Sequence, residues 1–144
     1  MSQRLWIPWL LPGLNEILTL QKQHTGRRQR VYWNAWATEK AVHGRDLFVL
    51  IRQAQLQPVE GRVTIQCEWV ERDRARDPDN IVAGGRKIVH DSLVACGILT
   101  DDSRQEIGRM IDEFFVDAGR PGVLVTLLPW EGQEEAARCH PLDR

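Results

Sequence analysis

The fold of this 144-residue chain is organised around residues 76–102, which read RDPDNIVAGGRKIVHDSLVACGILTDD. From Lys87 to Leu99 the apolar residues Val89, Leu93 and Cys96 have the spacing i, i+4, i+7 that is typical of a helix. Gly97 stands where a helix stop is expected. The segment therefore predicts a helix with a short acidic stretch on either side.

Two glycines interrupt the approach to this helix. Inside a helix, Gly84 and Gly85 would each cost about 1 kcal/mol relative to alanine. We therefore expect a bend or loop at residues 82–85 and a helix that begins near Arg86.

Acidic side chains precede the helix at Asp77 and Asp79. Pro78 fixes its own φ and pushes Asp77 toward an extended conformation. In an extended segment, residues i and i+2 point to one face with their Cα atoms roughly 7 Å apart. Two such carboxylates can converge on Mg²⁺, which prefers a few carboxylates and several retained waters. A third carboxylate, from Asp102 or Asp91, would complete the site.

The same residues also fit a simpler structure. Aspartates beside proline, asparagine and glycine are common in turns and helix caps. One acidic pair enters the predicted helix and another, Asp101 and Asp102, leaves it. The two pairs meet only if tertiary packing brings them together, so a turn or cap remains the alternative to a metal site.

Hydrophobic periodicity predicts other elements. Residues 62–71 alternate between apolar and polar side chains, as a half-buried strand does. A second helix is expected from Asn34 to about Gln55, and Leu5–Trp9 is expected to be a short first strand. The apolar stripe of that helix is Leu47, Leu50, Ile51 and Ala54.

The segment Lys22–Arg30 is polar and basic, without an apolar period, and is expected to be a mobile loop. Its arginines suit contacts with phosphate groups, which set affinity without reading sequence. The alternative is an exposed linker.

Composition bounds the class of protein. With 27% charged and 42% hydrophobic residues, the chain matches a single globular domain. The three cysteines form no Cys-x-x-Cys pair and are odd in number, so we expect reduced thiols in an intracellular protein. The apolar start, Leu5–Leu14, is too short and too broken by proline to span a membrane.

Charge is unevenly distributed along the chain. The net charge of −1 gives the chain no overall attraction for a polyanion. Residues 22–76, however, carry eleven Lys and Arg against six Asp and Glu, whereas residues 91–144 carry five against eleven. A patch of one sign matters more for binding than the total does. The alternative is that both halves are ordinary solvated surface.

Several motifs follow one another along the chain. They are Arg76-Asp77-Pro78-Asp79-Asn80-Ile81, Gly84-Gly85-Arg86-Lys87, Asp91-Ser92-Leu93-Val94, and Gly97-Ile98-Leu99 with Asp102. Together they resemble the RusA family of Holliday-junction resolvases, and most of all the branch common in phages and prophages. The resemblance covers roughly residues 5–130 and is far more specific than any one short motif.

The resemblance implies an α+β fold, with a small mixed β-sheet of about four strands and two main helices. It implies one RusA-like endonuclease domain over residues 1–144, with a core at about 5–130 and a polar tail at 131–144. Residues 103–116 are ambiguous, because Ser103-x-x-Glu106 resembles a capping box and a helical apolar stripe follows it. The resemblance instead implies a strand that forms a hairpin with Val123–Leu128, and we expect the strand.

The function implied by the resemblance is a Mg²⁺-dependent endonuclease, with Mn²⁺ as an alternative ion. It would resolve Holliday junctions and other branched DNA by paired nicks, in recombination, repair or phage DNA processing. A homodimer that presents two sites fits a four-way junction, whose strands are paired. The implied location is the bacterial cytoplasm, for a host, phage or prophage gene product, with no membrane partner.

Site residues carry over by their positions in the motifs. The catalytic residues would be Asp77, Asp79, Lys87 and Asp102. The metal ligands would be Asp77, Asp79 and Asp102, with Asp91 as a further candidate. Lys87 would neutralise the scissile phosphate or the leaving oxygen, although a plain i,i+4 salt bridge to Asp91 is the alternative. The DNA-binding residues would be Arg27, Arg28, Arg30, Arg74, Arg76, Asn80 and Arg86.

Two other functions stay open. The near-neutral net charge favours a DNA-structure-binding protein with weak or no cleavage. The retained acidic and lysine positions argue against it, because a pure binder does not need carboxylates that face phosphates. The second alternative is a metal-dependent phosphohydrolase that acts on small substrates, against which the basic loop argues.

Overall fold

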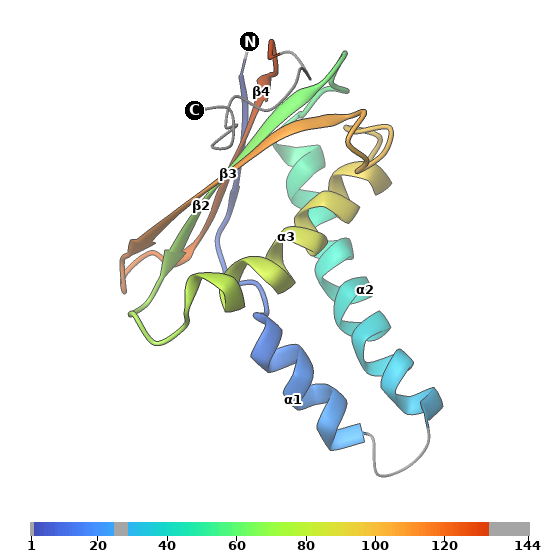
Figure 1. Cartoon of the computed structure of the whole chain (residues 1–144), viewed down its shortest axis with the longest axis vertical. Coiled ribbons are helices and arrows are strands. Elements are labelled where there is room, and N and C mark those ends of the chain that lie inside the picture. Colours follow the sequence, from blue (N-terminus) through green and yellow to red (C-terminus); the bar gives the residue numbers. More distant parts are fainter. Residues whose placement is uncertain (1, 25–28, 133–144) are drawn as a thin grey trace, which may run out of the picture.

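The computed structural model describes residues 2–24 and 29–132 and has the expected α+β architecture (Figure 1). In chain order its elements are β1 (Gln3–Ile7), α1 (Leu14–His24), α2 (Gln29–Gln53), β2 (Val63–Glu71), α3 (Pro78–Ala95), β3 (Ile107–Val116) and β4 (Gly122–Pro129). The strands form one mixed sheet in the order β1-β4-β2-β3. The two main helices are α2 and α3. Helix α3 crosses one face of the sheet, whereas α1 and the first half of α2 extend away from it (Figure 1).

Strand β2 confirms the prediction made from its alternating pattern. Its apolar residues Val63, Ile65, Cys67 and Trp69 are all buried. They face the helices, because Trp69 packs against the backbone of α3 at Gly85. The strand pairs with β4 on one side and with β3 on the other, so it lies inside the sheet.

Strand β3 is present as expected, but the hairpin expected between it and β4 is wrong. β3 pairs in parallel with β2, and β4 pairs antiparallel with β2 and β1. The physical reason is burial: Val123, Val125 and Leu127 of β4 are 1 to 2% exposed, which requires a central position. β3 has mostly exposed side chains and takes the edge.

The break expected at residues 82–85 is also wrong, because α3 runs without interruption from Pro78 to Ala95. A Cβ added to Gly84 would overlap the carbonyl oxygen of Pro12, and one added to Gly85 would lie 2.6 Å from the Trp69 ring. The glycines therefore allow the chain at Pro12 and the Trp69 ring to pack directly on the helix backbone. This packing offsets their low helix propensity.

The end of α3 confirms the predicted stop. Gly97 has φ +73°. Its N–H donates to the carbonyl of Val94 at 3.0 Å, and the N–H of Ile98 donates to the carbonyl of Leu93 at 2.9 Å. This pair of bonds is the Schellman motif, in which the left-handed position favours glycine because it has no Cβ.

Other boundaries differ from the expectations. Helix α2 begins at Gln29, before the expected cap at Asn34, and ends at Gln53. Helix α1 was not predicted. The mobile loop expected at Lys22–Arg30 is wrong at both ends, because α1 includes residues 22–24 and α2 includes Gln29 and Arg30. Strand β1 lies two residues before the expected strand. The stripe on α2 is confirmed at Leu47 and Ile51, which are 1 and 2% exposed.

Parts of the sequence predictions lie outside the described residues, namely residues 25–28 of the basic loop and residues 133–144 of the polar tail. Cys67 and Cys96 are free thiols, and Cys139 belongs to that tail. In the part of the chain that the structure describes, none of the helices combines the length and apolar character needed to cross a membrane.

Candidate functional site

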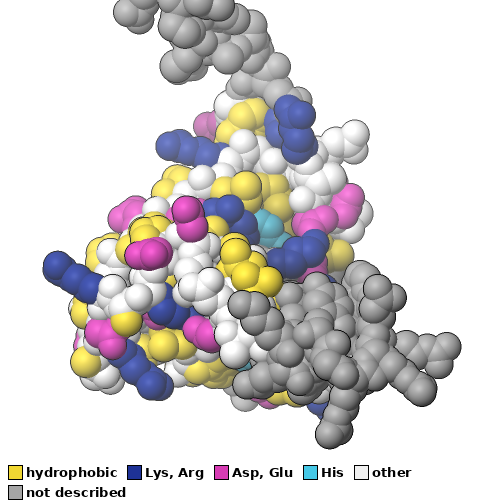
Figure 2. Space-filling model, turned by 60° about the horizontal axis from the view of Figure 1, so that its bottom comes forward, with side chains coloured by type: hydrophobic (Ala, Val, Ile, Leu, Met, Phe, Trp, Pro, Cys, Tyr) yellow, Lys and Arg dark blue, Asp and Glu magenta, His cyan; other side chains and the backbone are white. Residues whose placement is uncertain are grey.

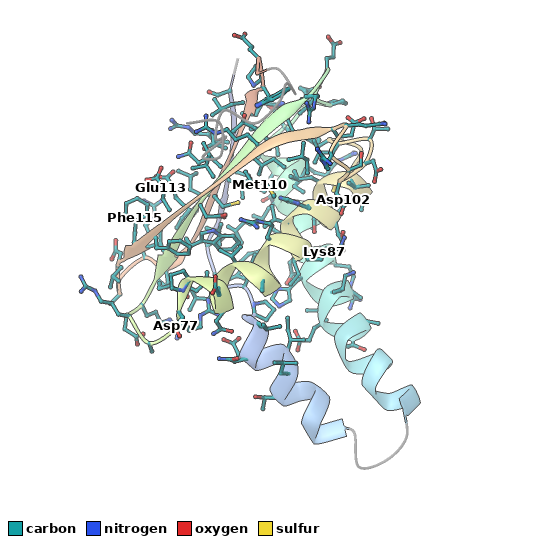
Figure 3. All side chains as sticks on the ribbon, viewed as in Figure 1. Asp77, Lys87, Asp102, Met110, Glu113 and Phe115 are labelled. Atoms are coloured by element: carbon teal, nitrogen blue, oxygen red, sulfur yellow. The ribbon has the colours of Figure 1, made fainter. Side chains whose placement is uncertain are left out.

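The candidate residues lie at two places along α3 (Figure 3). Asp77 and Asp79 stand at its N-terminus, whereas Lys87 lies farther along the helix and contacts Asp102. A helix rises 1.5 Å per residue, so Asp79 and Lys87 are separated by about 12 Å along the axis. α3 therefore carries two separate groups of candidate side chains.

Asp77 occupies the N-cap position of α3, with φ −72° and ψ 152°, and Pro78 is the first helical residue. The extended backbone predicted for Asp77 is confirmed. Asp79 is already helical, so the prediction that both side chains share one face of an extended segment is wrong. The reason is Pro78, whose fixed φ suits the first helical position.

The cap alternative describes the backbone of Asp77 but not its side chain. Within the described part of the chain, its carboxylate makes no capping hydrogen bond. Both carboxylates are exposed, and Asp79 lies in the first turn, where the helix dipole stabilises negative charge. Asp77 therefore keeps its acceptor capacity for a partner outside the helix.

Beside Asp77 the surface is hollowed. The hollow has a volume of about 570 Å³, in the range of ligand clefts. Exposed Arg74 lines it together with Asp77 and Pro78, and the end of β3 supplies Phe114, Phe115 and Val116. It combines two basic side chains, Arg74 and Arg76, with carboxylates and an apolar wall.

Arg76 was predicted to bind DNA, but its side chain is mostly buried and pairs within the protein. Its guanidinium donates to Glu71 at 2.6 Å, to Glu16 at 2.8 Å and to the carbonyl of Leu11 at 3.0 Å. Burial lowers the pKa of Arg76, but hydrogen bonds with Glu71 and Glu16 outweigh it and leave the pKa above its ordinary value. Arg76 therefore fastens the start of α1 to the loop before α3.

Asn80 has a similar structural task. Its Oδ1 accepts the backbone N–H of Asn15 at 2.7 Å, which satisfies a donor in the first turn of α1. Asn15 and Glu16 of α1 thus lie against Asn80 of α3 and against Arg76 of the loop before it.

Lys87 is the centre of the second group. Its Nζ lies 2.8 Å from Asp102 and 3.0 Å from Asp91, and Asp91 also pairs with Lys40 of α2 at 2.8 Å. The Lys87 side chain is 53% exposed. The i,i+4 pair expected with Asp91 is present, and the contact with Asp102 adds a link that helical spacing does not predict.

The ion pairs shift the pKa values of this group. Hydrogen bonds to Asp102 and then to Asp91 raise the pKa of Lys87, and the bond from Lys87 lowers the pKa of Asp102. Burial raises the pKa of Asp91, but hydrogen bonds from Lys40 and Lys87 outweigh it, so the net pKa is lowered. Lys87, Asp91 and Asp102 are therefore charged at neutral pH.

Arg86 points to the sheet. Its guanidinium pairs with Asp112 of β3, and Asp112 also accepts the indole N–H of Trp69 at 2.8 Å. Arg86 was predicted to bind DNA. In the structure, its guanidinium joins α3 to β3. Sequence reasoning missed Asp112 as a partner, and the available signal was the acidic pair Asp112 and Glu113 between the apolar residues of β3.

The predicted metal ligands are not brought together in one chain. Residues 2–24 and 29–132 contain no group of three or more histidine, cysteine or acidic side chains placed to hold a metal ion. Oxygen ligands lie about 2.1 Å from Mg²⁺, so two of them are at most about 4.2 Å apart. Asp77 and Asp102 lie toward opposite ends of α3 (Figure 3), so the set Asp77, Asp79 and Asp102 is not placed to share one ion in a single copy.

Of the predicted DNA-binding residues in the basic loop, one lies in the described part of the chain and two lie outside it. Arg27 and Arg28 lie outside the described residues, and Arg30 lies in the first turn of α2. Figure 2 shows basic and acidic side chains interspersed with hydrophobic ones across one face of the molecule. On the described residues of that face, charge is mixed instead of gathered by sign.

Comparison of the chain with protein-family models finds no match, and a search of curated proteins finds none either.

Proposed function

We propose that this protein is a Mg²⁺-dependent endonuclease that acts on branched DNA as a homodimer, as its RusA-like motifs imply. One observation carries the proposal. Lys87 lies 3.0 Å from Asp91 and 2.8 Å from Asp102, which is 15 positions away in sequence. Three motif residues thus gather at one half-exposed position.

Lys87 has the chemistry that a phosphate requires. Its ammonium is a compact charge with three donors. Its raised pKa keeps it cationic at neutral pH. Because it is 53% exposed, a phosphate oxygen can approach it. In the proposed reaction Lys87 stabilises the charge that grows on the phosphate or on the leaving oxygen.

The metal site of the proposed enzyme needs a second copy of the chain. Asp77 and Asp79 can supply two carboxylates, but the length of α3 keeps Asp102 of the same chain away from them. A carboxylate from a second copy supplies the third ligand. When bound, the ion would activate water and stabilise the negative charge of the transition state.

The test is a cleavage assay on a synthetic four-way junction, a linear duplex and a nucleotide, with Mg²⁺, with Mn²⁺ and without either ion. We expect nicks in the junction alone, and only with the metal. Asp79→Asn should abolish nicking while junction binding stays near that of the wild type, because losing a carboxylate lowers repulsion toward phosphate. Asp46→Asn, at an exposed position on α2, is the matched control and should cut normally.

Two results would contradict the proposal. The first is wild-type protein that leaves the junction intact in both metals. The second is an Asp79→Asn variant that nicks at the wild-type rate, which would remove Asp79 from the site.

A DNA-structure-binding protein is the second candidate. One observation favours it: the described residues of one chain include no three side chains that are placed to share a metal ion. This function forecasts tight junction binding without cleavage in either metal. Hydrolysis of the nucleotide alone would instead indicate a phosphohydrolase.

A further inference from the structure

The outer edge of β3 has backbone groups directed away from the sheet. The N–H of Asp117 donates to the carbonyl of Glu71 of β2 at 2.8 Å. Backbone groups alternate in direction along a strand, so the groups of Phe115, Glu113 and Ile111 also point to β2. Those of the even-numbered residues between them point outward. β3 is the last strand of the described sheet, and such an edge is a template for another strand.

The side chains along this edge are unusually apolar for a surface. Met110, Phe114, Phe115 and Val116 are 41 to 51% exposed. Figure 3 shows Met110, Glu113 and Phe115 placed along the strand. Single exposed apolar residues are ordinary, but four of them on one unpaired edge strand mark an interaction surface.

We propose that two copies of this chain pair through the outer edges of β3, antiparallel about a two-fold axis at Ile111. The inference rests on the proposed function in so far as that nuclease needs a second copy, and it adds the surface that the copy occupies. A two-fold axis makes the interface self-complementary and closed, which removes both exposed edges at once.

Charge selects this register. With Ile111 at the axis, Arg109 of each copy lies opposite Glu113 of the other, so two pairs of opposite charge form. An axis at Asp112 would place the two Asp112 side chains opposite each other, and an axis at Glu113 would do the same with the two glutamates. Like charges directly opposite are destabilising.

The apolar side chains fit the same register. Met110 lies diagonal to Phe114 of the second copy on the helix-covered face, within reach of an aromatic ring. Ile111 meets its own symmetry mate on the other face. Because the odd-numbered residues turn their backbone groups to β2, their cross-copy pairs are the closely spaced kind, without hydrogen bonds between them.

The pairing also joins the two groups of candidate residues. The antiparallel strands form one continued sheet with both α3 helices on the same face. The beginning of β3, which follows Asp102, then lies beside the end of β3 in the second copy. There Phe114, Phe115 and Val116 line the hollow at Asp77.

A disulfide tests the axis directly. In a chain that also carries Cys96→Ser and Cys139→Ser, Ile111→Cys places two thiols across the axis at a Cα separation of about 4.5 Å, within disulfide range. Phe115→Cys is the control, because eight strand positions separate its two thiols by about 27 Å. Mild oxidation should give covalent dimers with Ile111→Cys alone. Equal yields from both variants, or none from either, would overturn the register.

Charge reversal tests the contacts in the native cysteine background, by sedimentation without DNA or metal. Arg109→Glu and Glu113→Arg should each weaken the dimer by about tenfold or more, and the double variant should restore it. A monomeric wild-type protein, or a dimer indifferent to both reversals, would refute the interface. A dimer that follows the reversals but cuts no DNA would support this interface and contradict the nuclease.

Discussion

Replacing Gly84 by alanine tests how α3 is held against the N-terminal segment. Propensity alone forecasts a gain of about 1 kcal/mol, because alanine is the better helix former. The structure forecasts a loss. The new Cβ would overlap the carbonyl oxygen of Pro12 and lie 3.0 Å from Cδ1 of Ile17. The overlapping atom is backbone, so it cannot turn aside as a flexible side chain does.

The size of the loss follows from what must move. Overpacking of this kind typically costs about 1 to 3 kcal/mol. Separating α3 from the Pro12 turn also strains the bond between the Asn15 N–H and Asn80 Oδ1, and a lost hydrogen bond costs about 1 kcal/mol. After the propensity gain is subtracted, we expect Gly84→Ala to destabilise the protein by about 1 to 3 kcal/mol. At this chain length that lowers Tm by about 3 to 9 °C.

The matched control is Gly44→Ala in α2. Nothing lies within 4 Å of a Cβ added there, so only the propensity gain of up to about 1 kcal/mol remains. Urea unfolding, with the midpoint and the slope m compared, separates a change in stability from a change in the unfolded state. Opposite signs for the two variants are the expected result. If Gly84→Ala is as stable as Gly44→Ala, the close packing of Pro12 on α3 is refuted.

Two further predictions concern the Lys87 group. Lys87→Ala should lower the single-turnover nicking rate by about 10²-fold or more while it changes the free energy of unfolding by less than about 0.5 kcal/mol, because the pair is half-exposed. Lys40→Ala removes the other lysine that pairs with Asp91, and this variant should nick at the wild-type rate. If both variants lose the same nicking rate, Lys87 has a structural role only. Asp91 has a lowered pKa, so its ion pairs stabilise the protein above the ordinary value of 3.8 and lose that effect as the pH falls through the folded-state pKa. Between about pH 5 and about pH 2, wild-type stability should therefore fall more steeply than that of Asp91→Asn, and parallel curves would show that the pairs contribute nothing.

Local features of the fold could be predicted from the sequence. The alternation at residues 62–71 predicted β2, because a period of two places one set of side chains in the core. Gly97 predicted the end of α3, because a left-handed residue with φ +73° favours glycine. The i,i+4 spacing predicted the pair between Lys87 and Asp91. Each of these depends on residues a few positions apart.

The candidate site was predicted only in part, for the same reason. The sequence names Lys87 and Asp102, but their contact depends on how residues 96–101 turn back along α3. It also names Arg76 and Arg86 as phosphate contacts, whereas their guanidinium groups pair with Glu71 and Asp112 in the folded chain. A charged residue carries no local sign of whether its partner lies inside or outside the protein.

Only the tertiary structure decided the course of α3 and the place of β3. Gly84 and Gly85 break a helix by propensity, yet here they admit the Pro12 carbonyl and the Trp69 ring to the helix surface. β3 and β4 follow each other closely in sequence, yet β2 lies between them, because the more apolar β4 gains more from a central position. Both outcomes depend on which surfaces pack against each other between segments far apart in the sequence. A local pattern of residues does not specify that packing.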